Sequence, residues 1–262
     1  MTAGTSSRKP TLRVERALQR AGHRLLAGMD EGGRGALAGP VSVGVVVIDD
    51  VCRSAPVGVK DSKLLSHQMR ERMVPKIQAW ATAYAVGHAS PGEIDRYGIM
   101  VALRLAGTRA LTALPVIPDL VILDGSYDWL TDPQRVGLLG LLQGRAGDDL
   151  APCVPVMTMV KADLFCSSVA AASVLAKVER DAMMVALAAE VPGYAWELNK
   201  GYSAPEHCAA LESHGPTVHH RLSWRLPGVT SVVDADRAPV SDPADPLMDD
   251  DGAVLTDRGG EQ

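Results

Sequence analysis

Two adjacent carboxylates, Asp30 and Glu31, lie at the end of an apolar run and are followed by a glycine-rich segment. Adjacent side chains on a regular strand point to opposite faces of a sheet, so we expect the strand to end at Asp30 and the backbone to turn there. Gly32, Gly33 and Gly35 permit such a turn, because glycine tolerates positive φ. Two converging carboxylates repel each other unless a proton or a cation lies between them, and hard divalent cations prefer oxygen ligands. The pair is therefore a candidate metal site, although a lone Asp-Glu pair is more often an acidic turn between strands.

Two further apolar runs also lead to aspartates. Residues 120–123 are followed by Asp124, and residues 154–160 are followed closely by Asp163. Because ligands commonly bind where the strands of an α/β sheet end, we expect all four carboxylates to gather at one edge. Four carboxylates would suit two Mg²⁺ ions, which can orient a water, polarise a phosphodiester and stabilise the leaving oxygen. Each aspartate alone is more often a cap or turn residue, so their shared position after strands carries this prediction.

The elements that must position these carboxylates change from adjacent strands to strands separated by helices, which is typical of a mixed α/β domain. We expect strands at residues 24–29, 41–48, 80–89, 120–123 and 154–160. Helices are predicted at residues 11–22, 67–79, 91–114, 164–191 and 205–213. The expected organisation is a partly disordered N-terminal extension, a catalytic domain, and an acidic, disordered tail, at residues 1–22, 23–228 and 229–262. Residues 131–151 are rich in leucine and glycine without a clean period, and we interpret them as a loop or a small subdomain.

The net charge is unevenly distributed along the 262 residues. The segment 229–262 contains nine acidic and two basic residues, a net charge of −7, whereas the whole chain carries −5. The first 228 residues therefore carry +2. An acidic isoelectric point consequently does not exclude a polyanionic partner, although the charge does not demand one.

Cysteine spacing and hydropathy predict where in the cell the protein resides. The four cysteines include no Cys-x-x-Cys pair, so a structural zinc site is not expected, and reduced thiols in a cytoplasmic protein are favoured. The polar N-terminus lacks the apolar core of a signal peptide, and no apolar run approaches the length of a membrane span. We expect a cytoplasmic protein without a membrane partner, and nothing in the sequence suggests an obligate oligomer, so we expect a monomer.

A series of short motifs in a fixed order resembles the bacterial ribonuclease HII family, the type 2 RNases H, over most of residues 24–225. These motifs are GMDEGGRG at 28–35, LAGP at 37–40, DSK at 61–63, LDG at 123–125, KAD at 161–163, AAASVLAKVERD at 170–181, KGY at 200–202, GPT at 215–217 and HR at 220–221. Each motif alone is weak evidence, but the whole series in this order is highly specific.

The resemblance implies an RNase H-like α/β fold with a five-stranded mixed sheet flanked by helices, and a small C-terminal helical part. It also implies an endoribonuclease that cleaves the RNA strand of RNA·DNA hybrids and cuts 5′ to single ribonucleotides embedded in duplex DNA. Such an enzyme uses two divalent cations, Mg²⁺ or Mn²⁺, leaves 3′-hydroxyl and 5′-phosphate ends, and serves ribonucleotide removal in DNA replication and repair.

The family's functional residues map onto this chain one by one. Its four catalytic, metal-binding carboxylates fall on Asp30, Glu31, Asp124 and Asp163. Its glycine-arginine-glycine element, whose backbone would meet the ribose 2′-hydroxyl, and its junction-sensing tyrosine fall on Gly33, Arg34, Gly35 and Tyr202. The 2′-hydroxyl is the group by which a protein distinguishes RNA from DNA at a given site.

Other polar residues suit contacts with a nucleic-acid backbone. The hydroxyl and ammonium groups of Asp61-Ser62-Lys63 can bind phosphate oxygens without reading bases, although such a tripeptide is usually a solvated turn. Positive potential along a duplex could come from five further cations: Lys161, Lys177, Arg180, Lys200 and Arg221. For His219 and His220, a surface or hydrogen-bonding role is favoured over metal binding.

Two alternatives stay open at this point. A non-catalytic RNA·DNA-binding module would need the same duplex surface, but it would not need a complete set of four carboxylates. A resolvase-like or transposase-like metal nuclease acting on DNA would need the carboxylates, but it would have no use for a 2′-hydroxyl sensor built from the glycine-arginine-glycine element and Tyr202. Cleavage of an all-DNA substrate would separate this second alternative from the ribonuclease.

Overall fold

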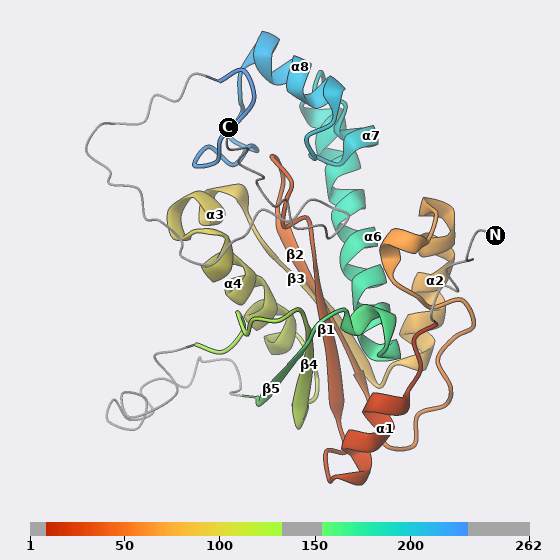
Figure 1. Cartoon of the computed structure of the whole chain (residues 1–262). Helices are drawn as coiled ribbons and strands as arrows, with labels where there is room; N and C mark the ends of the chain where they lie inside the picture. Colours follow the sequence, from red (N-terminus) through yellow and green to blue (C-terminus); the bar gives the residue numbers. More distant parts are fainter. Residues whose placement is uncertain (1–8, 133–153, 230–262) are drawn as a thin grey trace, which may run out of the picture. The chain divides into compact units, whose positions relative to one another are not determined.

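The computed structural model describes residues 9–132 and 154–229, and these residues form a five-stranded sheet with helices on both faces (Figure 1). The strands are β1 (Leu26–Gly32), β2 (Val41–Ile48), β3 (Ala83–Ala89), β4 (Leu120–Asp124) and β5 (Val156–Met159). The helices are α1 (Arg13–Arg20), α2 (His67–Trp80), α3 (Pro91–Tyr97), α4 (Ile99–Thr112), α6 (Ser167–Glu190), α7 (Trp196–Asn199) and α8 (Pro205–His214). Two short 3₁₀ turns are η1 (Ser62–Leu64) and η3 (Ala162–Leu164). The predicted mixed α/β architecture is confirmed.

The strand order in the sheet is β3-β2-β1-β4-β5. Strands β1, β2 and β3 form an antiparallel meander, whereas β4 pairs in parallel with β1 and with β5. Parallel neighbours end at the same edge of a sheet, so the C-terminal ends of β1, β4 and β5 lie together. This edge is where the sequence placed the carboxylates.

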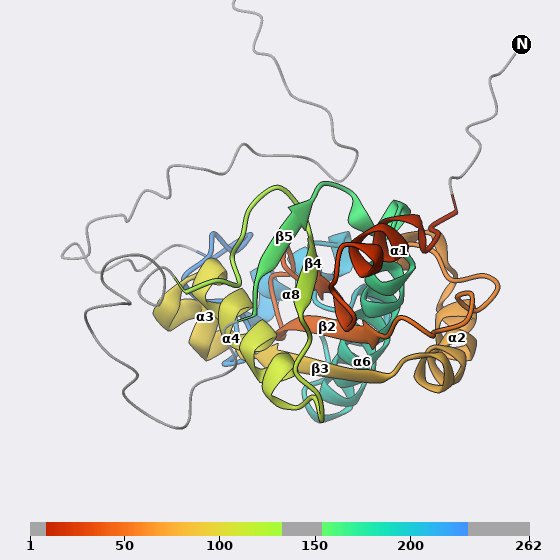
Figure 2. The same cartoon turned by 90° about the horizontal axis from the view of Figure 1, so that it is seen from below.

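Alternation along the strands divides the core into two layers. The odd-numbered residues of β2, Val41 to Val47, pack with α3 and α4, whereas Val46 and Ile48 pack with α2 and α6. Figure 2 shows the sheet between these two sets of helices, with α4 on one side and α6 and α2 on the other. Every residue of β2 is buried, as expected for an interior strand covered on both faces.

Helix α6 approaches the sheet closely because small residues line both partners. Its first half contains Ala170, Ala171 and Ala172, all fully buried, and it lies directly over Gly28 of β1. A Cβ atom built on Gly28 would lie 2.3 Å from the carbonyl carbon of Ser168 and 2.4 Å from the nitrogen of Val169. The glycine therefore fixes the distance between β1 and α6, which together carry much of the site.

Three sequence predictions need correction. Strand β1 does not end at Asp30 but continues to Gly32, with Glu31 paired to Val43 and Gly32 paired to Ser42. The helix predicted over 91–114 is two helices, because Gly98 adopts a φ of +79° between α3 and α4. Helix α6 begins at Ser167 rather than at residue 164, because residues 162–164 form η3.

Other predictions either agree or fall outside the described residues. Ser66 caps α2, and the predicted helices at 11–22 and 205–213 are confirmed as α1 and α8. Most of the segment 131–151 and the tail after residue 229 lie outside the described ranges. Among the described helices, none is long and apolar enough to cross a membrane, and the three described cysteines, Cys52, Cys166 and Cys208, form no disulfide.

Substituting Gly28 by alanine tests the close approach of α6. The added methyl group would overlap backbone atoms of Ser168 and Val169, which cannot rotate away as a side chain could. We expect Gly28→Ala to lower the free energy of unfolding by about 1 to 3 kcal/mol, measured by urea denaturation. The control is Gly92→Ala, because a Cβ there meets nothing within 4 Å. Equal stability of the two variants would contradict this packing.

Candidate active site

Three aspartates from three elements converge at the edge where β1 and β4 end. Asp30 belongs to β1, Asp124 is the last residue of β4, and Asp163 lies in η3 after β5. One carboxylate oxygen from each lies within 4.8 Å of the other two. The parallel pairing of β4 with β1 and β5 brings these side chains together, as the sequence predicted for these three of the four carboxylates.

Burial raises the pKa of each aspartate in the absence of a cation, and repulsion by acidic neighbours adds to the rise at Asp30 and Asp163. Asp30 is 7% exposed, and desolvation followed by the charges of its acidic neighbours raises its pKa well above the ordinary value. Desolvation also raises the pKa of Asp124, although the backbone N–H of Ala162 donates to its Oδ1 at 2.6 Å. Desolvation and the neighbouring charge of Asp124 raise the pKa of Asp163 to about 7. Loss of solvation is thus the largest cause at all three aspartates, and the charges of acidic neighbours add to it at Asp30 and Asp163.

Glu31 is placed differently from the three aspartates. The continuation of β1 directs Asp30 and Glu31 to opposite faces of the strand, and Glu31 is not part of the 4.8 Å group. Its Oε1 lies 3.7 Å from Nη1 of Arg34. Burial raises the pKa of Glu31, and the positive charge of Arg34 opposes that rise. Glu31 remains close enough to Asp124 for their charges to interact, so it borders the cluster.

The Asp61-Ser62-Lys63 motif forms a turn beside the aspartates. The carboxylate of Asp61 accepts a hydrogen bond from the backbone N–H of Lys63 at 2.9 Å and caps η1. The hydroxyl of Ser62 is buried and lies 2.7 Å from the hydroxyl of Ser173 on α6. Asp61 and Ser62 therefore shape the turn, whereas the positive charge of Lys63 lowers the pKa of Glu31, Asp124 and Asp163.

Two buried arginines hold the backbone of the glycine-arginine-glycine element. Arg221 donates to the carbonyl oxygens of Gly33 and Arg34, each at 2.6 Å. Arg180 donates to the carbonyl oxygens of three further residues, Pro40, Ala38 and Lys200, at 2.8 to 3.1 Å. Both guanidinium groups are fully buried. The prediction that Arg180 and Arg221 present charge to a duplex is therefore wrong, because they face inward and position the loop.

The side chain of Arg180 leaves no room for a Cβ atom at Gly33. The φ of this glycine is +81°, and a Cβ atom there would lie 1.9 Å from Nε of Arg180. Gly35 is exposed, and a Cβ there would meet nothing within 4 Å. The loop therefore has one face locked onto the arginines and one face open to solvent.

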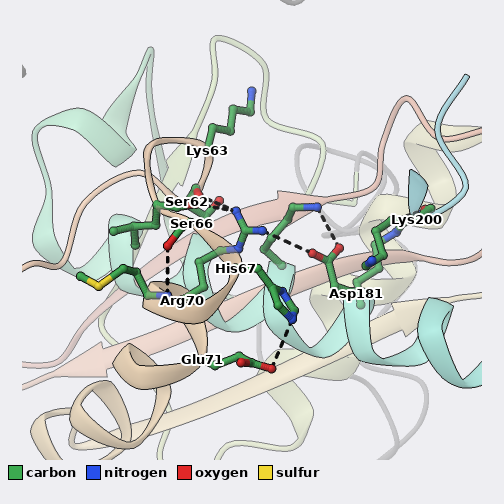
Figure 3. Close-up of polar contacts among 12 residues, drawn as sticks. Ser62, Lys63, Ser66, His67, Arg70, Glu71, Asp181 and Lys200 are labelled. Carbon is green, nitrogen blue, oxygen red and sulfur yellow. Dashed lines mark hydrogen bonds and ion pairs between the residues drawn. The ribbon is translucent and has the colours of Figure 1, made fainter. Parts of the chain in front are cut away.

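Lys177, one of the remaining predicted cations, belongs to a second charged cluster next to Tyr202. Lys177 Nζ lies 2.8 Å from Oδ1 of Asp181, and Arg70 Nη2 lies 3.7 Å from Oδ2 of the same carboxylate. Figure 3 shows Arg70 between the backbone of Ser62 and Asp181, with the side chain of Lys63 pointing away from this pair. Lys177 also lies 5.5 Å from the centroid of the Tyr202 ring. Lys161 is exposed and adopts a φ of +58° just before η3.

Comparison with known proteins identifies the family. A model of the family described as Ribonuclease HII matches residues 27–226 of the chain. A ribonuclease HII of Streptomyces coelicolor is 48% identical over 216 residues, which are 82% of this chain and 83% of that protein. The chain belongs to the ribonuclease HII family. A ribonuclease HII of Nitrosococcus oceani is 43% identical and covers 76% of this chain and 88% of its own length.

The solved structures agree with the ribonuclease HII assignment. The crystal structure of the ribonuclease H2 from Pyrococcus horikoshii OT3 matches with a TM-score of 0.60 and 28% identity, over 78% of this chain and 95% of that one. The fold is therefore RNase H-like, as the resemblance implied. Membership in the ribonuclease HII family makes the chain a ribonuclease H endonuclease, which cleaves the RNA strand of RNA·DNA hybrids. The non-catalytic alternative is thereby removed.

Several residues of this ribonuclease HII site were not singled out from sequence. Ser173 hydrogen-bonds to Asp30, Arg70 binds the carbonyl oxygens of Ser62 and Leu65, and Asp181 pairs with Lys177. Nδ1 of His207 donates to the backbone carbonyl oxygen of Tyr202. A serine inside an alanine-rich helix facing a predicted carboxylate was the available signal for Ser173, because a polar residue there needs a partner.

Neutralising one aspartate should stabilise the metal-free protein. The folded-state pKa of Asp163 is about 7 against an ordinary 3.8, so the folded state binds more protons between these values, and wild-type stability falls as pH rises through that window. In EDTA at pH 8, we expect Asp163→Asn to raise the free energy of unfolding by about 1 to 2 kcal/mol after allowance for solvent screening.

The same comparison at pH 5 provides the internal check. There the wild-type Asp163 is largely protonated in the folded state, so the gain from Asp163→Asn should shrink. Asp50→Asn is the control, because Asp50 forms a solvent-exposed pair with Arg24 at 3.1 Å, and its effect should stay within about 0.5 kcal/mol at both pH values. A loss of stability in Asp163→Asn at pH 8 would contradict the repulsion.

Proposed function

We propose that this enzyme cuts on the 5′ side of ribonucleotides, including single ribonucleotides embedded in duplex DNA, and leaves 3′-hydroxyl and 5′-phosphate ends. The observation that carries the proposal is the three-aspartate cluster at the sheet edge, bordered by Glu31, in the same domain as a glycine-arginine-glycine loop whose Gly35 is exposed. The cluster supplies the chemistry, and the loop supplies a surface flat enough to meet a ribose. The biological role we infer is removal of ribonucleotides from DNA in replication and repair.

Two divalent cations, Mg²⁺ or Mn²⁺, fit the donor set of this site. All the available donors are carboxylate oxygens, namely those of Asp30, Glu31, Asp124 and Asp163, and hard cations prefer such ligands. Desolvation, followed by the charges of neighbouring carboxylates, raises the pKa of Asp30 and Asp163, and a bound cation would oppose that rise. When bound, the cations would orient a water and stabilise the charge that develops on the phosphodiester. Hydrogen bonds hold these carboxylates in place: Ser173 binds that of Asp30, and the N–H of Ala162 donates to that of Asp124.

Recognition of the ribose would use the open face of the loop together with Tyr202. Arg221 fixes the carbonyl oxygens of Gly33 and Arg34 on the inner side, so the backbone of the loop is preorganised before substrate arrives. Tyr202 would stack near the sugar that follows the ribonucleotide. Backbone contact needs no particular base, which suits an enzyme that must act at any sequence.

Contacts with phosphates would come mainly from lysine side chains. Lys63 carries its charge close to the aspartates, on a turn built by Asp61 and Ser62. Lys161 lies exposed immediately before Asp163. We therefore divide the predicted substrate-binding motif into Lys63, which would meet a phosphate, and Asp61 and Ser62, which position it. The expectations of a cytoplasmic location and a monomeric state stay predictions.

Cleavage of a labelled DNA duplex with one ribonucleotide tests the proposed function. We expect one cut 5′ to the ribonucleotide with Mg²⁺ or Mn²⁺, no cut in EDTA, and no cut in an all-DNA duplex, because only the ribose offers a 2′-hydroxyl. Product ends are identified by ligation and phosphatase treatment. Degradation of an RNA·DNA hybrid with no cut at the single ribonucleotide would contradict the proposed specificity, and comparable cleavage of the all-DNA duplex would favour a DNA nuclease.

Asp124→Asn should abolish cleavage while leaving duplex binding largely intact. The amide keeps the shape of the side chain and the contact with Ala162 N–H through its oxygen, but it removes the charge that a cation requires. We expect kcat to fall by a factor of about 10³ or more, with duplex affinity measured by fluorescence anisotropy in Ca²⁺ changed by less than about threefold. Asp128→Asn, a change at a loop residue that caps Leu130 and Thr131, is the control. Turnover retained in Asp124→Asn would overturn the assignment.

A further inference from the structure

Two histidines lie completely buried beneath the loop that carries Tyr202. His207 belongs to α8, and His220 lies in the segment after it. Trp196 of α7, also fully buried, completes the group, and its ring centroid lies 6.1 Å from that of His207 and 5.2 Å from that of His220. Neither histidine touches the aspartate cluster, and the proposed reaction uses neither ring.

The hydrogen bonds of His207 determine its protonation state. Its Nδ1 lies 2.8 Å from the carbonyl oxygen of Tyr202, which can only accept, so Nδ1 carries the proton. Its Nε2 lies 3.1 Å from Nε1 of Trp196, which can only donate, so Nε2 carries none. His207 is therefore a neutral ring with its proton on Nδ1.

The hydrogen bonds of His220 fix the opposite tautomer. Its Nδ1 lies 2.9 Å from the backbone N–H of Thr217, which donates, so the proton of His220 lies on Nε2. That Nε2 is 3.1 Å from the bare Nε2 of His207, to which it donates. The donations thus run in one direction, from Thr217 through His220 and His207 to Tyr202. Burial lowers the pKa of both histidines, which agrees with two neutral rings.

The end of this chain of donors fixes the backbone at Tyr202. The N–H of Tyr202 donates to the carbonyl of Asn199, and the carbonyl of Gly201 accepts from the N–H of Leu37 at 2.8 Å. The turn that carries Tyr202 is therefore held by His207 at the carbonyl oxygen of Tyr202 and by Leu37 at that of Gly201. The Tyr202 ring lies 5.3 Å from the guanidinium of Arg180, which in turn blocks any side chain at Gly33.

We propose that His207 and His220, as a neutral pair of opposite tautomers, position Tyr202 and thereby set the enzyme's ability to cut at a single ribonucleotide in DNA. This inference rests on the proposed role of Tyr202. A long RNA·DNA hybrid presents many equivalent sites and tolerates a misplaced tyrosine. A single ribonucleotide offers one junction, so its cleavage depends on the position of the ring. His207 and His220 are positioning residues, since they act through Tyr202.

Two substitutions at the same position separate the proposed role from a general effect on folding. In His207→Asn, the amide nitrogen can take the place of Nδ1 and keep the hydrogen bond to the Tyr202 carbonyl. In His207→Gln, the longer side chain can reach Trp196 through its amide oxygen, but it no longer places a donor at Nδ1. The two variants therefore retain opposite ends of the network. His214→Gln is the control, because His214 lies at the edge of Tyr194 and outside the chain of donors.

The readout is the ratio of kcat/KM on a single-ribonucleotide duplex to kcat/KM on a long hybrid. We expect His207→Gln to lower this ratio by about tenfold or more, whereas the ratio of His207→Asn should stay within about threefold of wild type. His214→Gln should leave the ratio unchanged. Equal losses on both substrates in His207→Gln and His207→Asn would overturn the positioning role, because they would indicate a structural effect only.

The tautomers themselves provide a second, independent test on the wild-type protein. Long-range ¹H–¹⁵N correlation spectra at neutral pH should show one buried histidine protonated on Nδ1 and one on Nε2, assigned by the loss of each signal in His207→Gln and in His220→Gln. A charged ring or identical tautomers would overturn the inference. A wild-type enzyme that cleaves hybrids but leaves the single-ribonucleotide duplex intact would overturn the proposed specificity itself, and this inference with it.

Discussion

Repulsion among buried carboxylates is the constraint on which this structure depends. Asp30, Asp124 and Asp163 would separate or become protonated in a flexible protein, because like charges at such distances in a poorly solvated site are costly. Here a sheet with apolar layers on both faces fixes two of them, and η3 fixes the third. The free energy gained in the core thus holds together groups that oppose each other, and a divalent cation is the natural means of relieving that opposition.

A second constraint is the burial of two arginines that form no ion pair with any carboxylate in the part of the chain that the structure describes. Arg180 and Arg221 are fully buried, and their donors are satisfied by backbone carbonyl oxygens of the loops around residues 33–40 and 200. A guanidinium group presents five N–H donors in a rigid plane, so it can organise several carbonyl groups at once. Since Arg180 contacts both loops and Arg221 holds the first of them, the glycine-arginine-glycine element and the Tyr202 turn are expected to keep a fixed separation. The histidine pair then controls the orientation of that turn through the carbonyl oxygen of Tyr202.

Much of this arrangement could be predicted from sequence, for identifiable reasons. Apolar runs that end in Asp124 and lead to Asp163 have strong strand patterns, and parallel pairing places their ends together without further information. The strand containing Asp30 was predicted to end too early, because the glycines after Glu31 suggested a turn. Pairing with Val43 and Ser42 of β2 keeps that strand extended instead, and this pairing is visible only in the structure.

Arg180 and Arg221 were interpreted as surface charge because sequence alone does not show that backbone carbonyl groups can satisfy a buried guanidinium. The histidine chain likewise depends on contacts between segments up to 13 residues apart.

The most direct test of the central claim is calorimetric titration of the metal-free enzyme with MnCl₂ at pH 8, in parallel with Asp30→Asn. If the carboxylate cluster is a site for divalent cations, the wild type should bind Mn²⁺ saturably and unfold at a higher temperature once loaded, whereas Asp30→Asn should bind far more weakly and gain little. The absence of saturable binding in the wild type, or binding of equal strength in Asp30→Asn, would contradict the account.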